Sequence, residues 1–280
     1  MKTKAILLFL LCIVGYTTAT AQSDVYCWKD GKAVKMEKLD SITFTAPASE
    51  NPQVDEPTEV DEPTGPARDL AEATTKDIGK IIGEDGKIYA TKEDAEAAGI
   101  TAVAMIAYVG NDAETNSTYR HGLALALKDV NGIKNWCSQF SETCSGTYYN
   151  LESAAKIDMA GLANTDALVY HSSHAHAAAI GARNYKYTND ADEGAHPEVT
   201  SAWFLPSAGQ WNKMATAAGG YVNLMTNACL QSNVYWSSSE RNPYSAWCFY
   251  TAGGGFLTGS GFWNDVYKGS AARVRPCLAF

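Results

Sequence analysis

The sequence predicts an α+β fold, because short strand patterns flank a central region with helical periodicity. Residues 78–89 have the pattern of a strand, a tight turn and a second strand. The apolar runs Ala102–Val109 and 122–130 are typical of buried strands. A hydrophobic content of 46%, with 11% aromatic residues, can fill a sizeable core in a chain of 280 residues.

Two helices are expected in the middle of the chain. Alanines recur at helical spacing over residues 165–185, and Asn164 is a candidate cap for this helix. Pro206 and Ser207 are suited to the start of a second helix, which the glycine pair at 219–220 is expected to end.

The C-terminal part returns to strand patterns. Strands are expected at residues 234–238, 245–251 and 272–275. Arg273 and Arg275 would then share one face of the last strand and make hydrogen bonds or ion pairs. Residues 252–270 are rich in glycine and aromatic side chains, and we expect them to form a long irregular loop, which is usually functional.

The N-terminus has the features of a secretory signal peptide over residues 1–21. Lys2 and Lys4 precede an apolar run at residues 5–16, and small residues follow at 19–21. The run is shorter than the roughly 20 residues that span a bilayer. We therefore expect removal of this segment and export to the extracellular space, the cell surface or the periplasm, with no transmembrane segment in the mature chain.

Three regions are expected after the signal. Residues 22–45 predict a small β-hairpin with its turn at Asp30-Gly31. Residues 46–68 combine repeated prolines with acidic residues and few large apolar side chains, which predicts an extended, disordered linker. The main domain is expected to occupy residues 69–280.

Charge and motifs exclude several function classes. The formal net charge is −9, and no run of lysines or arginines could neutralise a row of phosphates, so nucleic acid is not an expected partner. The sequence contains no serine-hydrolase elbow, phosphate-binding glycine loop or dinucleotide fingerprint. No enzyme activity and no cofactor are therefore expected.

Six cysteines remain after the signal, an even number that permits disulfides in an oxidising compartment. Cys137 and Cys144 could close a small loop, and Cys277 could pair with Cys229 or Cys248. The alternative is that these residues are free thiols in the core. None of them has the spacing of a zinc site.

Several motifs occur in an order that resembles bacterial C-type-lectin-like domains. They are "WFLPSAGQW" at residues 203–211, "YWSSSE" at 235–240, "AW" at 246–247 and "VRPCLAF" at 274–280. The chain from residue 78 onward looks like the C-terminal domain of bacterial collagen-like adhesins. It is more closely similar to the variable proteins that diversity-generating retroelements target.

This resemblance implies a C-type-lectin-like fold with mixed, mainly antiparallel sheets, two helices and long C-terminal loops. It also implies that Trp211, Trp236 and Trp247 are scaffold residues. Ligand contacts, to a protein or glycan on another cell or host surface, would come from the region before the final strand. The candidate binding residues there are Arg241, Asn242, Tyr244, Phe249, Tyr250, Phe256, Phe262, Trp263, Asn264, Asp265 and Tyr267. Such aromatic and polar residues suit an adaptable surface, although strand alternation should turn about half of the aromatics inward.

No metal site is expected. Trp263-Asn264-Asp265 matches a tripeptide of calcium-binding animal lectins, but the companion motif is incomplete, because this chain has Glu240-Arg241-Asn242-Pro243. His171 and His174 have helical spacing, yet no cysteine or carboxylate completes a recognised motif with them.

Two other functions stay open. The chain could be a structural or tip subunit of a surface appendage, in which the N-terminal hairpin pairs with a strand of a partner. Formylglycine-generating enzymes elaborate a related scaffold, and an oxidase of this type would require Cys248 or Cys277 as its reactive thiol. If a retroelement diversifies the loop residues, a template repeat that differs mainly at adenines should lie nearby in the genome.

Overall fold

A computed structural model of the chain describes residues 25–29, 32–36, 67–115, 117–138, 147–171, 175–231, 234–251 and 262–280, with the backbone alone at 25–29, 32–36 and 262–264. The chain divides into two units, Met1–Thr58 and Glu59–Phe280, and the described residues of each are treated separately. In the first unit, β1 (Val25–Lys29) pairs antiparallel with β2 (Lys32–Met36). These are the two strands that the sequence predicts after the signal.

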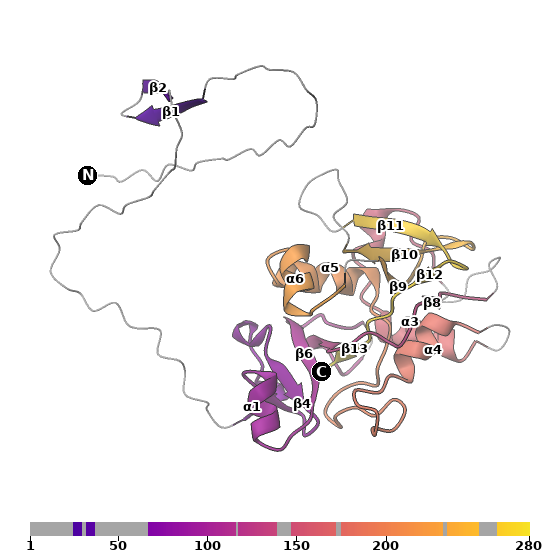
Figure 1. Ribbon diagram of the computed structural model, residues 1–280. Helices are drawn as coiled ribbons and strands as arrows, with labels where there is room; N and C mark the ends of the chain where they lie inside the picture. The colour runs from indigo at the N-terminus through magenta and orange to yellow at the C-terminus, as the bar shows by residue number, and fades with distance from the viewer. Residues whose placement is uncertain are drawn as a thin grey trace. The chain divides into compact units, whose positions relative to one another are not determined.

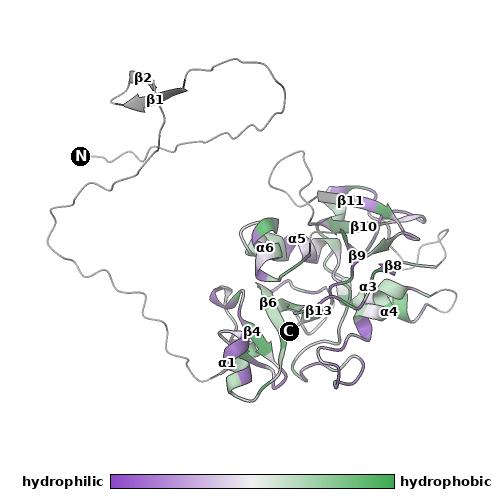
Figure 2. Ribbon diagram, in the orientation of Figure 1, coloured by the Kyte–Doolittle hydropathy of each residue, from purple (hydrophilic) through white to green (hydrophobic). Residues whose placement is uncertain are grey.

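The second unit has the predicted α+β class, with antiparallel sheets (Figure 1). Its largest sheet has six strands, and their spatial order is β13 (Cys277–Ala279), β7 (Gly122–Ala126), β6 (Ala102–Val109), β4 (Ile81–Gly83), β5 (Lys87–Tyr89) and β3 (Arg68–Asp69). Green colour along β4 and β6 in Figure 2 marks them as apolar. This is expected because side chains cover both faces of this sheet.

A second sheet contains three strands in the order β11 (Phe262–Tyr267), β10 (Ser245–Tyr250) and β9 (Val234–Glu240). β9 and β10 confirm the predicted strands, but the prediction of an irregular loop over residues 252–270 is wrong where β11 forms. Alternation is hard to recognise in β11 from the sequence, because the strand lies at an edge and is mixed in polarity. A further two-stranded sheet joins β8 (Lys134–Asn135) to β12 (Ala271–Ala272).

Six α-helices occur among the described residues, where the sequence predicts two. They are α1 (Lys92–Ala97), α2 (Glu152–Ala155), α3 (Gly161–Val169), α4 (Ala177–Arg183), α5 (Ala208–Ala217) and α6 (Tyr221–Asn227). The glycine pair ends α5 as predicted, but α6 begins directly after it. Among the residues that the structure describes, no helix is long and apolar enough to cross a membrane.

The prediction of one helix over residues 165–185 is wrong, because the chain leaves the helical path between α3 and α4. His176 lies in this break and is completely buried, and its ring packs edge-on against the Trp136 ring with 5.7 Å between the ring centres. Asn164 lies inside α3 rather than at its cap, and its side chain donates to Asp158 at 3.1 Å. Burial and hydrogen bonding, rather than alanine spacing, therefore decide the helix boundaries here.

Helix α5 starts as the sequence predicts and then connects the two large sheets. The Ser207 side chain accepts a hydrogen bond from the Gln210 backbone, and the Gln210 side chain accepts one from the Ser207 backbone at 2.9 Å. On its buried face, the Trp211 ring stacks on the Phe249 ring of β10 at 4.7 Å. α5 contacts β6 on one side and β9 and β10 on the other (Figure 1).

Large aromatic side chains fill both sides of the three-stranded sheet. Trp211 and Phe249 belong to the cluster that is shared with the six-stranded sheet. Trp236 lies in a separate cluster on the opposite face. Trp211 and Trp236 are 0% exposed and Trp247 is 5% exposed, so all three are core residues as the sequence analysis expects.

The C-terminal strand begins later than the predicted residues 272–275. Ala272 ends β12, Arg273 forms a single bridge with Tyr235, and β13 starts at Cys277. The two arginines nevertheless interact as predicted. Arg273 and Arg275 both pair with Asp129, at 3.2 and 2.7 Å.

The predicted disulfides of Cys277 are wrong. Cys277 and Cys248 are buried free thiols in different core clusters, and Cys229 is an exposed free thiol. Core side chains separate Cys277 from Cys248. The alternative given by the sequence, free thiols in the core, therefore holds for these two residues. Cys144 and the Cys27 side chain lie outside the described residues.

A buried carboxyl group joins the loop after β6 to the helices. Glu114 is 1% exposed and accepts hydrogen bonds from the Gln210 side chain at 2.7 Å and the Leu162 backbone at 3.0 Å. Burial raises the pKa of Glu114 to about 7, although these hydrogen bonds oppose the rise.

We expect Glu114 to make stability depend on pH. Its folded-state pKa lies above the ordinary value of 4.5, so the stabilisation is complete below pH 4.5 and is lost as the pH rises to about 7. Urea unfolding between these pH values should show a fall of up to about 3 kcal/mol that Glu114→Gln removes. The exposed Glu93→Gln serves as the control, and an unchanged pH profile in Glu114→Gln would contradict the assignment.

Candidate functional site

The turn between β9 and β10 presents the first part of the candidate surface. The Asn242 side chain accepts hydrogen bonds from the backbone N–H groups of Tyr244 and Ser245, at 2.8 and 2.9 Å. These bonds fix the turn in one conformation, because an asparagine side chain here replaces a missing backbone acceptor. The Tyr244 side chain is left 59% exposed.

Strand β11 brings the second part of the surface beside this turn. Tyr267 lies opposite Ser245 in the antiparallel ladder, and Asp265 lies opposite Trp247. Opposite residues in such a ladder point to the same face of the sheet. Asp265 and the 50% exposed Tyr267 therefore share the face of Trp247, near the end of the sheet from which Tyr244 projects.

An ion pair connects the two parts. The Arg241 guanidinium lies 2.6 Å from the Asp265 carboxylate and 5.8 Å from the centre of the Trp247 ring. Burial by itself would raise the pKa of Asp265, but hydrogen bonding to Arg241 outweighs it and lowers the pKa. The carboxylate is thus ionised at neutral pH and holds Arg241 across the strands.

Five predicted site residues, Arg241, Asn242, Tyr244, Asp265 and Tyr267, are therefore brought together at one end of the sheet. We call them the tyrosine surface. Phe249 is not part of it, because it is fully buried against Trp211. Tyr250 is half-buried and packs on the opposite face, against the cluster of Trp236.

The other predicted binding residues lie outside what the structure describes. This holds for Phe256 as a whole and for the side chains of Phe262, Trp263 and Asn264, whose backbone belongs to β11.

Beneath the tyrosine surface lies an ion pair that sequence reasoning missed. Glu240 and Lys268 directly precede Arg241 and follow Tyr267, and their side chains pair although both are 0% exposed. The Lys268 ammonium also lies 4.7 Å from the centre of the Trp136 ring. The backbone N–H of Lys268 donates to the Tyr244 carbonyl at 2.9 Å, so this buried pair holds both ends of the surface.

A neighbouring segment, residues 147–150, was also missed. The Tyr149 backbone N–H donates to the Glu240 carbonyl at 2.9 Å, and the Trp247 indole donates to the Tyr149 carbonyl at 2.8 Å. The segment thus extends the sheet beside β9. Burial raises the pKa of Tyr149 to about 12, so its phenol stays protonated. Its sequence, a tyrosine pair after a serine-rich stretch, carries no periodic signal.

The two thiols that an oxidase would require are poorly suited to nucleophilic chemistry. Cys248 and Cys277 are completely buried, and burial raises the pKa of each thiol well above its ordinary value. Among the described residues, no cluster of three or more histidine, cysteine, aspartate or glutamate side chains could hold a metal ion. The ring centres of His171 and His176 lie 5.2 Å apart in an edge-on contact, and residues 172–174 are outside the described part.

Comparison with known proteins gives little further information. No family model and no curated protein matches the sequence. The chain is similar to the crystal structure of a fimbrial protein from Bacteroides ovatus, with a TM-score of 0.49 and 17% identity over 72% of this chain. It covers 48% of that chain, about half of its length.

We expect the buried pair to be essential for the stability of this end of the sheet. Lys268→Met would leave the Glu240 carboxylate buried without its cation, which costs about 3–5 kcal/mol in urea unfolding. The double variant Glu240→Gln/Lys268→Met removes both charges and should recover most of this loss. Lys213→Met, which breaks the exposed pair with Asp112, is the control and should cost at most about 1 kcal/mol. If the free energy lost in the double variant equals the sum of the losses in Lys268→Met and Glu240→Gln alone, the prediction is contradicted.

Proposed function

We propose that this chain is an exported, surface-displayed binding protein that recognises a protein or glycan ligand through the tyrosine surface, without covalent chemistry. The observation that carries the proposal is the exposure of Tyr244 and Tyr267, at 59% and 50%, beside a sheet that buries Trp236, Trp247 and Phe249. Exposed tyrosines supply rigid, amphipathic contact area with few rotatable bonds, so they are typical of recognition surfaces.

The chemistry of the surface fits a ligand with both flat apolar and polar parts. Two phenol rings can pack against a sugar ring or a peptide side chain, and each also offers a hydroxyl group. Arg241 and Asp265 add a cation and an anion next to the rings. Because the ion pair holds the Arg241 and Asp265 side chains and the Asn242 hydrogen bonds fix the backbone of the turn, these parts lose little entropy on binding.

The proposed fold type is C-type-lectin-like. Its support is the position of the family motifs, because the tryptophans of "WFLPSAGQW", "YWSSSE" and "AW" all lie in the core. The exposed Tyr244 and Tyr267 come from the segments that follow β9. A rigid core with a replaceable surface suits diversification by a retroelement, which belongs to the same proposal.

The binding proposal is tested with glycan and protein arrays that are probed with the mature full-length chain. We expect ligand hits whose signal falls about tenfold or more in Tyr244→Ala/Tyr267→Ala, because the loss of two aromatic anchors removes the centre of the contact. Tyr170→Ala is the matched control, since Tyr170 is 78% exposed at the end of α3, and should bind like the wild type. Hits that the double variant retains in full would exclude the tyrosine surface as the binding site.

A second candidate function is a structural or tip subunit of a surface appendage. The specific observation is that β1 and β2 form a sheet of only two strands, with no third strand among the described residues. An isolated two-stranded hairpin is marginally stable in water and gains stability when a further strand pairs with its edge. A strand from a partner subunit would supply this pairing.

Deletion of residues 25–44 distinguishes the two functions. If the hairpin serves assembly, the deletion should abolish display on the cell surface, measured by antibody labelling of intact cells, and leave array binding unchanged. Deletion of residues 46–65 removes an equal length of linker and should preserve display. Normal display of the hairpin deletion would contradict the assembly role.

A further inference from the structure

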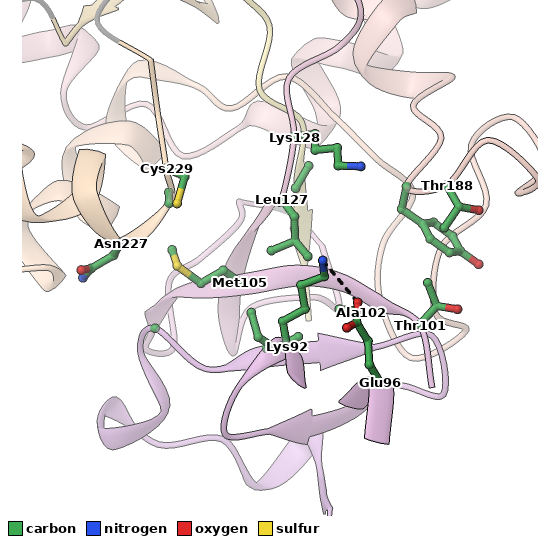
Figure 3. Close-up of a pocket in the computed structure, with 15 residues that line it drawn as sticks. Lys92, Glu96, Thr101, Ala102, Met105, Leu127, Lys128, Thr188, Asn227 and Cys229 are labelled. Carbon is green, nitrogen blue, oxygen red and sulfur yellow. Dashed lines mark ion pairs between the residues drawn. The ribbon is translucent and has the colours of Figure 1, made fainter. Parts of the chain in front are cut away.

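The second unit contains a cavity that is separate from the tyrosine surface. It has a volume of about 390 Å³. α1, β4 and β6 line one side of it, and the segments that follow β7 and α6 line the other side (Figure 3). This volume is within the range of small-molecule sites, which are mostly apolar with a few polar groups that orient the ligand.

The floor of the cavity is apolar. Ile81 and Ala102 are each 8% exposed and Met105 is 4% exposed, and all three line the cavity. The floor is therefore formed by residues of the hydrophobic core. Leu127 extends from the opposite side toward this floor (Figure 3). An apolar group placed here would lose contact with water on several sides, which favours binding.

The rim of the cavity carries two lysines on opposite walls (Figure 3). Lys92 of α1 pairs with Glu96 at 3.2 Å, but both side chains are more than half exposed, so this pair is weak and can rearrange. Lys128 is exposed and forms no ion pair with another described residue. The rim thus has an excess of positive charge in a chain whose net charge is −9.

We propose that this cavity binds a small organic anion with an apolar body, such as a medium-chain carboxylate. The apolar body would lie on the floor, and the carboxylate would meet the ammonium groups of Lys128 and Lys92. Thr188 and Asn227 also line the cavity, and their side chains are hydrogen-bond donors. A cation would be repelled by both lysines, and a neutral molecule of the same length would lack the ionic contact.

One wall residue provides an independent reporter of occupancy. Cys229 lines the cavity and has an exposed thiol, whereas Cys248 and Cys277 are buried. A ligand in the cavity should cover this thiol and slow its alkylation by iodoacetamide. Mass spectrometry of the peptide that contains Cys229 measures this rate at the single site.

The test uses calorimetric titration of the mature full-length chain with decanoate, decan-1-ol and decyltrimethylammonium, below the concentrations at which they aggregate. We expect decanoate to bind and to protect Cys229, decan-1-ol to bind about tenfold or more weakly, and the cation not to bind. Lys128→Glu should weaken decanoate binding about tenfold or more, and Lys92→Glu should also weaken it. Both positions are on the surface, so the variants should keep the wild-type melting temperature.

Lys87→Glu is the matched control, because it makes the same charge change at an exposed residue of β5 outside the cavity, and it should bind decanoate normally. Equal binding of the three compounds, or equal decanoate affinity in Lys128→Glu, would overturn the proposal. Absence of both decanoate binding and Cys229 protection at about 1 mM would overturn it as well. Tyr244→Ala/Tyr267→Ala should still bind decanoate, so failure of this inference is distinguishable from failure of the proposed function.

Discussion

The buried ion pair between Glu240 and Lys268 is the constraint on which the C-terminal sheet depends. Each charge would be costly in the interior alone, and together they fix the end of β9 against the residue that follows β11. Arg241 follows Glu240 and Tyr267 precedes Lys268 in the sequence, so the buried pair fixes the backbone positions of both residues. The Trp136 ring adjoins the ammonium group and ties the same point to β8.

The tyrosine surface is also rigidly connected to the rest of its unit. Helix α5 contacts both large sheets, and the stacked rings of Trp211 and Phe249 fill the space between them. Close-packed protein cores resist small displacements. A ligand at the end of β10 would therefore meet a preformed backbone framework, which lowers the entropy cost of binding.

The tyrosine surface and the apolar cavity rest on different elements and select different chemistry. The surface is open, aromatic and of mixed charge, and it belongs to the turn between β9 and β10 and to β11. The cavity is concave and apolar with two lysines at its rim, and it belongs to α1, β4, β6 and the chain after β7. An extended partner fits the first, whereas a molecule of limited size fits the second.

The sequence by itself determined the features that depend on local chemistry. These are the α+β class, the buried strands β6, β9 and β10, and the start of α5, since apolar runs and a capping box act within a few residues. Tertiary structure decided the break between α3 and α4, the strand β11, the free thiols of Cys248 and Cys277, and which candidate aromatics face outward. It also decided the pairing of Glu240 with Lys268, which are 28 residues apart. Contacts between distant segments set these outcomes, and no pattern within one segment encodes which distant surface will cover it.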